Sequence, residues 1–91
     1  MLGNVIGIEE NVVQLKLKVD LEKVQNLINM YVVFEEETRL LVGEIIDIKD
    51  GIAFINLLGE FINEKFVFGV VKKPAFGSNV KLVSKEKVID W

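Results

Sequence analysis

Short runs of β-prone residues, separated by turn signals roughly every 8–12 residues, dominate this chain. The clearest run spans residues 12–19, where Val13, Leu15, Leu17 and Val19 alternate with polar residues and so give one apolar and one polar face. Similar runs cover residues 2–8, 30–35, 39–49, 52–58, 66–71 and 79–83. Several carry a central glycine, which lets a strand bend at a barrel corner. The pattern predicts an all-β fold, a small closed or partly open β-barrel of about six or seven short strands.

Turn residues separate these runs. Asp50-Gly51 lies between two apolar runs and predicts a two-residue hairpin. One segment departs from the strand pattern: Asp20 can cap a helix, and apolar residues follow it at helical spacing up to Ile28. We therefore expect one short helix near residues 21–28, whose apolar stripe covers one end of the barrel.

The inventory of reactive side chains excludes most catalytic chemistry. The chain has 91 residues, of which 51% are hydrophobic, and this predicts a single domain over residues 1–91. It has no cysteine and no histidine. Its serine and threonine residues are Thr38, Ser78 and Ser84. Cysteine nucleophiles, the commonest general base and the commonest metal ligand are therefore missing, and a hydrolytic triad cannot be assembled. We predict no catalytic residues, no bound metal and no cofactor in this chain, which is not expected to be an enzyme.

Charge is distributed unevenly along the chain. The net charge is −3, but residues 1–64 carry 5 basic and 12 acidic side chains, whereas residues 65–91 carry 6 basic and 2 acidic ones. An acidic body argues against direct binding of nucleic acid. The basic segment is interpreted as a solvated surface or as a contact for a phosphate or an acidic neighbour. Residues 1–4 have no basic targeting character and no apolar run is long enough to span a membrane, so we expect a cytoplasmic protein without membrane contact.

Two groups of carboxylates lie close together in the sequence. Glu35, Glu36 and Glu37 are adjacent, and adjacent strand residues point to opposite faces, so a solvated turn is favoured over a site for a hard cation. Glu44 and Asp47 are three residues apart in a strand, and this spacing predicts opposite faces rather than a carboxylate pair.

The run at residues 52–58 is apolar on both faces, although a small barrel buries only the inner face of a strand within itself. The outer face must then meet the helix, another domain or another copy of the barrel. The same holds for residues 66–71. Periodicity allows either face to be the inner one. The interpretation adopted here places Phe54, Phe66 and Phe68 in the core. It assigns the following residues to a protein–protein surface: Ile55, Leu57, Val67 and Val71.

Three stretches of sequence resemble a known family. They are the opening Gly3-Asn4-Val5-Ile6-Gly7, the run Leu41-Val42-Gly43-Glu44-Ile45-Ile46-Asp47-Ile48, and Lys73-Pro74-Ala75-Phe76-Gly77-Ser78-Asn79-Val80-Lys81-Leu82-Val83. Together they are similar to the N-terminal barrel that HerA-type DNA-translocating ATPases share with rotary ATP synthase subunits. The order of the stretches agrees over residues 2–83.

This resemblance implies a function for the chain. In that family the barrel is non-catalytic, precedes a RecA-like ATPase core and helps to hold a ring, usually a hexamer, together. It would thus be the N-terminal domain of a longer DNA translocase or helicase, mediating oligomerisation and docking to the ATPase core or a partner nuclease. ATP and Mg²⁺ are expected only in the downstream domain, and DNA is contacted only through the full-length protein. Residues 35–38 form a short turn where family members often carry longer insertions.

A second family offers an alternative. Val42-Gly43-Glu44-Ile45-Ile46-Asp47, followed by Asp50-Gly51, also resembles PRC-type barrels, which are adaptor modules. This resemblance implies binding of a protein or of an RNA-processing partner. The two readings differ in topology, because a barrel whose first strand returns to meet the late strands favours the HerA-like one.

Overall fold

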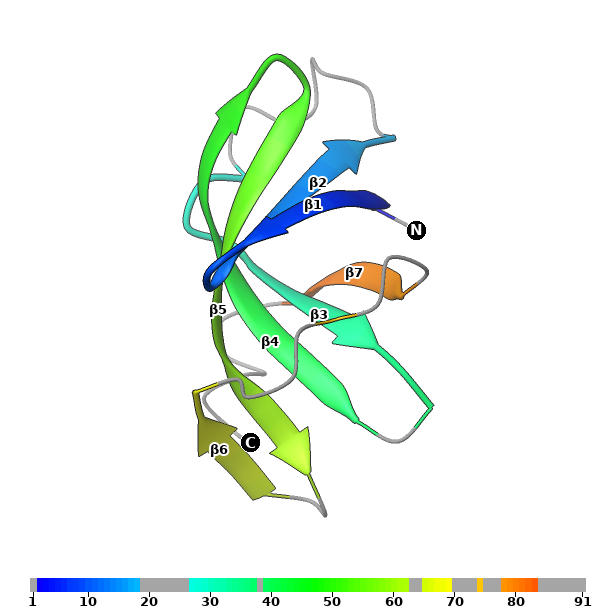
Figure 1. Cartoon of the computed structure of the whole chain (residues 1–91), viewed down its shortest axis with the longest axis vertical. Coiled ribbons are helices and arrows are strands. Elements are labelled where there is room, and N and C mark those ends of the chain that lie inside the picture. Colours follow the sequence, from blue (N-terminus) through cyan, green and yellow to red (C-terminus); the bar gives the residue numbers. More distant parts are fainter. Residues whose placement is uncertain are drawn as a thin grey trace.

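Seven antiparallel strands make up the regular structure of the described residues (Figure 1). The computed structural model describes residues 2–18, 27–37, 39–62, 65–69, 74 and 78–83. The strands are β1 (Gly3–Glu9), β2 (Val12–Leu17), β3 (Tyr31–Glu35), β4 (Leu40–Lys49), β5 (Ile52–Ile62), β6 (Lys65–Phe68) and β7 (Asn79–Val83). The predicted all-β class is confirmed, and so is each expected strand to within a few residues at its ends.

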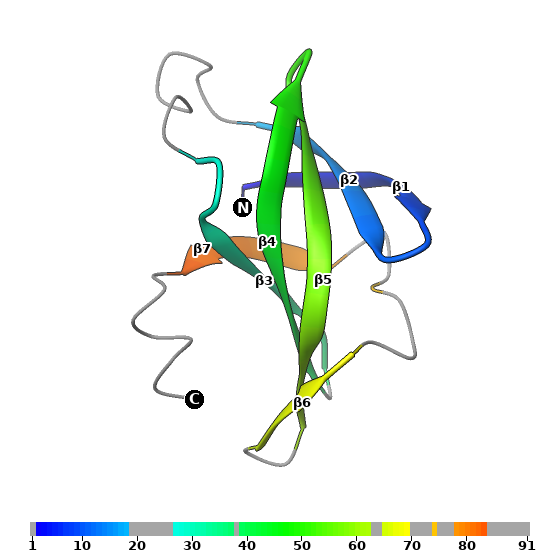
Figure 2. The ribbon, with the colours of Figure 1, turned by 90° about the vertical axis from the view of Figure 1, so that its left-hand side faces the viewer.

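The strands form one curled sheet in the order β1-β2-β5-β4-β3-β7, with β6 paired to β5 outside this path. Strands β3, β4 and β5 are consecutive neighbours, and β2 lies beside β5, which is a Greek-key arrangement. Figure 2 shows the long strands β4 and β5 side by side, with β1 and β2 crossing on one side of them. The sheet curls so far that the amide of Leu2, just before β1, donates a 2.9 Å hydrogen bond to the carbonyl oxygen of Val80 in β7.

The inner face of the curl holds the hydrophobic core. Its members are buried apolar side chains from six strands and from two positions beside them: Leu2, Val5, Val13, Leu15, Leu27, Val32, Phe34, Leu41, Ile45, Ala53, Ile55, Leu57 and Val80. Val33 and Val42 pair across β3 and β4 and are also buried, but outside this cluster. The apolar residues of the strands therefore fill the half-barrel and also bury part of its outer face.

One short helix was expected near residues 21–28. Of these positions, 21–26 lie outside the described residues. Leu27 and Ile28 are described and are not helical, because the amide of Met30 closes a turn on the Leu27 carbonyl at 3.0 Å. The amide of Asn29 then bonds the Ile45 carbonyl at 2.7 Å, which aligns this turn with β4. Leu27 is buried in the core. Its side chain therefore helps to cover one end of the barrel, which is the role expected of the apolar stripe.

The predicted hairpin at Asp50-Gly51 is confirmed. Lys49 pairs with Ile52, and the two central residues have φ values of 55° and 77°. Positive φ at both positions is the mark of a type I′ turn, whose twist matches that of the flanking strands. Gly51 supplies the second of these values without the cost that a side chain would add.

Register irregularities change which residues share a face. Between Ile45 and Asp47 the pairing of β4 with β5 shifts by one residue, so that Ile46 is an extra residue and is exposed. Beyond the shift Asp47 pairs with Phe54, while Glu44 pairs with Asn56. Phe54 and Asn56 are two apart on β5, and their partners therefore share one face of the sheet. The prediction that Glu44 and Asp47 lie on opposite faces is wrong, because strand parity does not survive a bulge.

Gly59 allows β6 to approach β5 closely. A Cβ atom at this position would overlap the carbonyl oxygen of Val67 and lie 2.7 Å from Cζ of Phe66. We expect Gly59→Ala to lower the free energy of unfolding by about 1–3 kcal/mol, the usual cost of overpacking. The measurement is urea unfolding followed by circular dichroism.

Gly7→Ala is the matched control. A Cβ at Gly7 meets only the Gln14 side chain, with its closest contact at 3.4 Å, so the expected change is within about 0.5 kcal/mol. Equal effects of the two substitutions would show that close packing against β6 does not make a side chain at position 59 destabilising.

Candidate functional site

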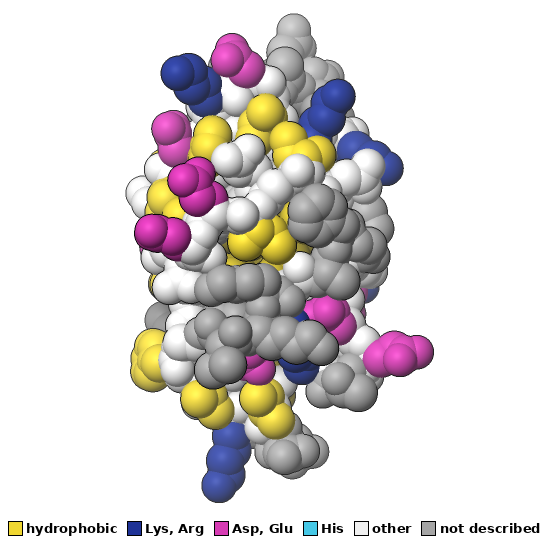
Figure 3. Space-filling model, in the orientation of Figure 1, with side chains coloured by type: hydrophobic (Ala, Val, Ile, Leu, Met, Phe, Trp, Pro, Cys, Tyr) yellow, Lys and Arg dark blue, Asp and Glu magenta, His cyan; other side chains and the backbone are white. Residues whose placement is uncertain are grey.

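The two most exposed large apolar side chains of the described residues lie on β6. Phe68 is 85% exposed and Val67 is 50% exposed. Ile62 at the end of β5 is exposed on the same face of the β5–β6 ladder as Val67, whereas Phe68 lies on the opposite face. Figure 3 shows hydrophobic side chains gathered at this end of the molecule, next to a basic side chain. We call Ile62, Val67 and Phe68, which lie on the two faces of the β5–β6 ladder, the β6 patch. This end of the β5–β6 hairpin therefore exposes large apolar side chains on both of its faces.

The backbone holds Phe68 in its exposed position. Phe68 pairs with Gly59 in the β5–β6 ladder, and the amide of Gly69 then donates a 2.9 Å hydrogen bond to the Leu58 carbonyl. The Phe66 ring contacts the Phe68 ring edge to face, with centroids 5.1 Å apart and planes at 86°. Within the described part of the chain, β5 is the one strand that pairs with β6. Phe68 is therefore a preformed apolar projection on an edge strand.

The residues assigned to a protein–protein surface do not lie together. Ile55 is fully buried and Leu57 is nearly so, both within the core cluster, while Val67 is exposed and Val71 lies outside the described residues. The inner and outer faces of β5 are the reverse of the interpretation adopted from the sequence. The reason is pairing: Ile55 is opposite Val13 of β2 and Ile45 of β4, both of which point into the curl.

The phenylalanines that were assigned to the core also differ from expectation. Phe54 and Phe66 are half-buried on the outer face of the sheet, and Phe68 is the most exposed large apolar residue described. The sequence analysis missed Phe68 and Ile62 as surface residues. The available signal was Gly69, which ends a very short strand and so leaves its last side chain without a covering neighbour.

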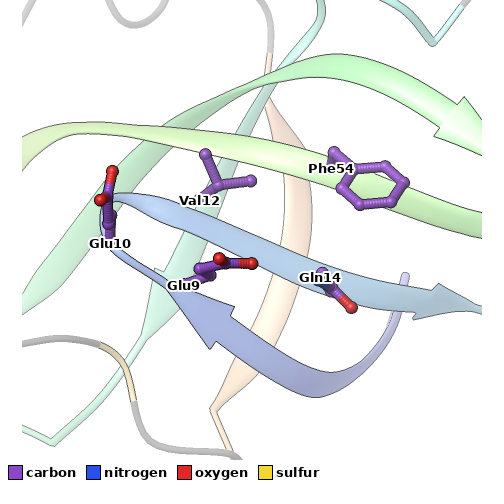
Figure 4. A pocket seen from close by; sticks show the side chains of 5 residues that line it. All are labelled: Glu9, Glu10, Val12, Gln14 and Phe54. Carbon is purple, nitrogen blue, oxygen red and sulfur yellow. The ribbon is translucent and has the colours of Figure 1, made fainter.

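A shallow depression of about 290 Å³ lies on the outer face, at the turn between β1 and β2. It is lined by Glu9, Glu10, Val12, Gln14 and Phe54. Figure 4 shows the Phe54 ring toward one end of the depression and the Glu10 carboxylate at the other. Both glutamates are exposed, so the depression combines an apolar wall with negative charge. Such a surface suits an apolar group carried on a basic segment.

An ion cluster joins the turn after β3 to the end of β5. The Arg39 guanidinium donates from Nε to Oε1 of Glu36 at 2.9 Å and from NH1 to Oε1 of Glu60 at 3.0 Å. Glu60 is only 7% exposed and is the buried acidic residue of the described chain. The cluster satisfies a carboxylate that burial would otherwise disfavour.

The three adjacent residues Glu35, Glu36 and Glu37 were expected to form a solvated turn, but two of them make ion pairs. Glu36 binds Arg39, and Glu35 accepts a hydrogen bond from the Asn79 side-chain amide at 3.0 Å and an ion pair from Lys81 at 2.9 Å. Only Glu37 is fully on the surface. Two of the three carboxylates therefore stabilise the contacts of β3 with β7 and with the following turn.

No protein-family model matches the chain, and no curated protein matches it. Among the residues described, no three His, Cys, Asp or Glu side chains are grouped in a way that could hold a metal ion. Nor does that part of the chain contain a helix with the length and apolar character needed to cross a membrane. The β6 patch and the depression beside Phe54 are therefore the two candidate binding surfaces of the described residues.

We expect Arg39→Met to lower the free energy of unfolding by about 3 kcal/mol, because it leaves the Glu60 carboxylate buried without its partner. The control is Lys81→Met, which removes an exposed ion pair with Glu35 and is expected to change stability by less than about 1 kcal/mol. Chemical unfolding of both variants checks the difference. A loss in Arg39→Met no larger than in the control would mean that solvent satisfies Glu60.

Proposed function

We propose that this chain is a non-catalytic assembly barrel of a HerA-like DNA-translocating ATPase. In this role it holds the subunits of a ring together and docks to the ATPase core or to a partner nuclease. The observation that supports the proposal most is the approach of the two ends of the sheet: the amide of Leu2, just before β1, donates a 2.9 Å hydrogen bond to the carbonyl oxygen of Val80 in β7. A first strand that returns to the late strands favours the HerA-like reading of the sequence, and the order of the resembling stretches agrees with that reading.

The distribution of reactive groups agrees with an accessory role. The chain contains no histidine and no cysteine. The exposed side chains of the β6 patch are apolar and carry no reactive group. In this proposal ATP and Mg²⁺ bind only to the downstream domain, and DNA is contacted through the assembled protein. The protein works in the cytoplasm, where the ring is expected to be hexameric.

A PRC-type adaptor barrel is the second candidate. It is favoured by the β4–β5 hairpin, where Asp50-Gly51 forms the type I′ turn that this resemblance includes. In that case the β6 patch binds a different protein instead of another subunit, and no ring forms. The two functions therefore predict different assembly states for the same surface.

The experiment is light scattering after size exclusion on the product of the whole gene, combined with an assay of ATP hydrolysis. We expect a ring that hydrolyses ATP, and a 91-residue chain that does not hydrolyse it. A whole gene product that is monomeric and lacks ATPase activity would overturn the assembly proposal and favour the adaptor function.

A further inference from the structure

The depression beside Phe54 brings anionic, amide and aromatic side chains around one shallow space of about 290 Å³. The exposed carboxylates of Glu9 and Glu10 come from the end of β1 and the turn that follows it. Figure 4 shows the Glu9 carboxylate between Glu10 at one end and Phe54 at the other, where the ring is seen nearly face-on. Gln14 and Val12 of β2 complete the lining. One ligand can therefore contact all three kinds of group.

The two carboxylates have no cation partner in the part of the chain that the structure describes. The ion pairs there all involve Arg39 or Lys81, and none includes Glu9 or Glu10. The side-chain amide of Gln14 likewise makes no hydrogen bond to another described residue. These acceptors are therefore not satisfied by the described chain itself and can accept from a ligand.

Lys16 lies on the same face of the sheet as the depression but does not line it. It is four residues beyond Val12, which pairs with Glu9, so it lies roughly 13 Å along the strand from that pair. This separation exceeds the Debye length of about 8 Å at physiological ionic strength. Lys16 therefore does not neutralise the end of the depression that carries the two carboxylates.

Strand β4 adds negative charge on the other side of the depression. Asp47 pairs with Phe54, and Glu44 pairs with Asn56 one pair further along the same face. Lys49 is two residues beyond Asp47 in the opposite direction and so lies farther from the depression than Asp47 does. The charges closest to the lining residues are therefore negative, which favours a cationic ligand.

We propose that the depression binds the arginine side chain of a partner protein. A guanidinium stays charged at all physiological pH values, offers five N–H donors and stacks on aromatic rings. In this site it stacks on Phe54 and donates to the Glu9 carboxylate and the Gln14 side-chain oxygen. The aliphatic stem of the arginine packs on Val12. The inference does not depend on which proposed function holds, since each involves docking to another protein.

Arginine fits this lining better than lysine does. A lysine ammonium is compact and strongly hydrated, and it presents no plane to an aromatic ring. A planar guanidinium can stack on the ring and donate to a carboxylate at the same time, because its donors lie in the plane and its faces are free. The mixture of one aromatic ring with carboxylate and amide acceptors therefore points to a guanidinium.

The measurement is an NMR titration of the 91-residue chain with the tripeptide Gly-Arg-Gly, acetylated and amidated at its ends. We expect saturable shifts of the Val12, Gln14 and Phe54 amides with a Kd of about 1 mM, as for a small exposed site. The tripeptide with lysine in place of arginine is expected to bind at least roughly threefold more weakly. The tripeptide with citrulline, which has the shape of arginine without its charge, is expected not to saturate.

Two variants test the lining residues. Phe54→Leu keeps an apolar side chain at this half-buried position and removes the aromatic ring, and Glu9→Gln removes one exposed charge. Each is expected to raise the Kd of the arginine tripeptide roughly fivefold. The matched controls are Phe68→Leu and Glu37→Gln, which make the same changes at exposed positions outside the lining and are expected to leave the Kd unchanged. Circular dichroism verifies that each variant is folded.

Several outcomes would overturn the inference. Equal binding of the citrulline tripeptide would show that charge is not recognised, and equal binding of the lysine tripeptide would show a general attraction of cations. Absence of saturable shifts, or shifts that survive both Phe54→Leu and Glu9→Gln, would show that the depression is not the site. Tighter binding of free arginine than of the tripeptide would identify the amino acid, and not a partner protein, as the ligand. None of these results bears on the assembly function, which is tested on the whole gene product.

Discussion

Backbone pairing along both edges of β5 is the constraint on which the rest of the fold depends. One edge is occupied by β4 over nearly the full length of the strand. The other edge is divided: β2 pairs with residues 52–56 and β6 with residues 59–62. At the division the Leu57 amide donates to the Asn11 carbonyl, and the Leu58 carbonyl accepts from the Gly69 amide, so hydrogen bonding continues between the two ladders. The barrel wall thus continues through β2, and β6 is left outside it.

This division also places the two candidate surfaces. The depression lies where β2 and its turn follow the first half of β5, and Phe68 lies where β6 follows the second half. A strand outside the barrel wall has one edge without a covering ladder, and its side chains face solvent on more than one side. The exposure of Phe68 is therefore a consequence of topology.

Polar contacts stabilise the end of the sheet at which β3 ends and β4 begins. Arg39 and Glu60 are 21 residues apart in sequence, yet they meet because β4 and β5 are antiparallel and Leu41 pairs with Glu60. The same end of β3 is tied to β7 by the contacts of Glu35 with Asn79 and Lys81. Such contacts favour one register, since a shift of one residue would bury charges without partners. They stabilise the position of β7, whose Val80 carbonyl accepts from the Leu2 amide, the contact on which the proposed assembly function rests.

Local pattern alone determined the all-β class, the positions of the strands and the Asp50-Gly51 turn, because alternation and turn propensity act over a few residues. The absence of histidine and cysteine was equally plain from the sequence. The tertiary structure alone decided the inner face of β5, because both of its faces are apolar and only the pairing of Ile55 with Val13 and Ile45 selects one. It also decided that Glu44 and Asp47 share a face, since the bulge at Ile46 breaks parity, and that Phe68 is exposed. These features depend on partners distant in sequence, which no local pattern encodes.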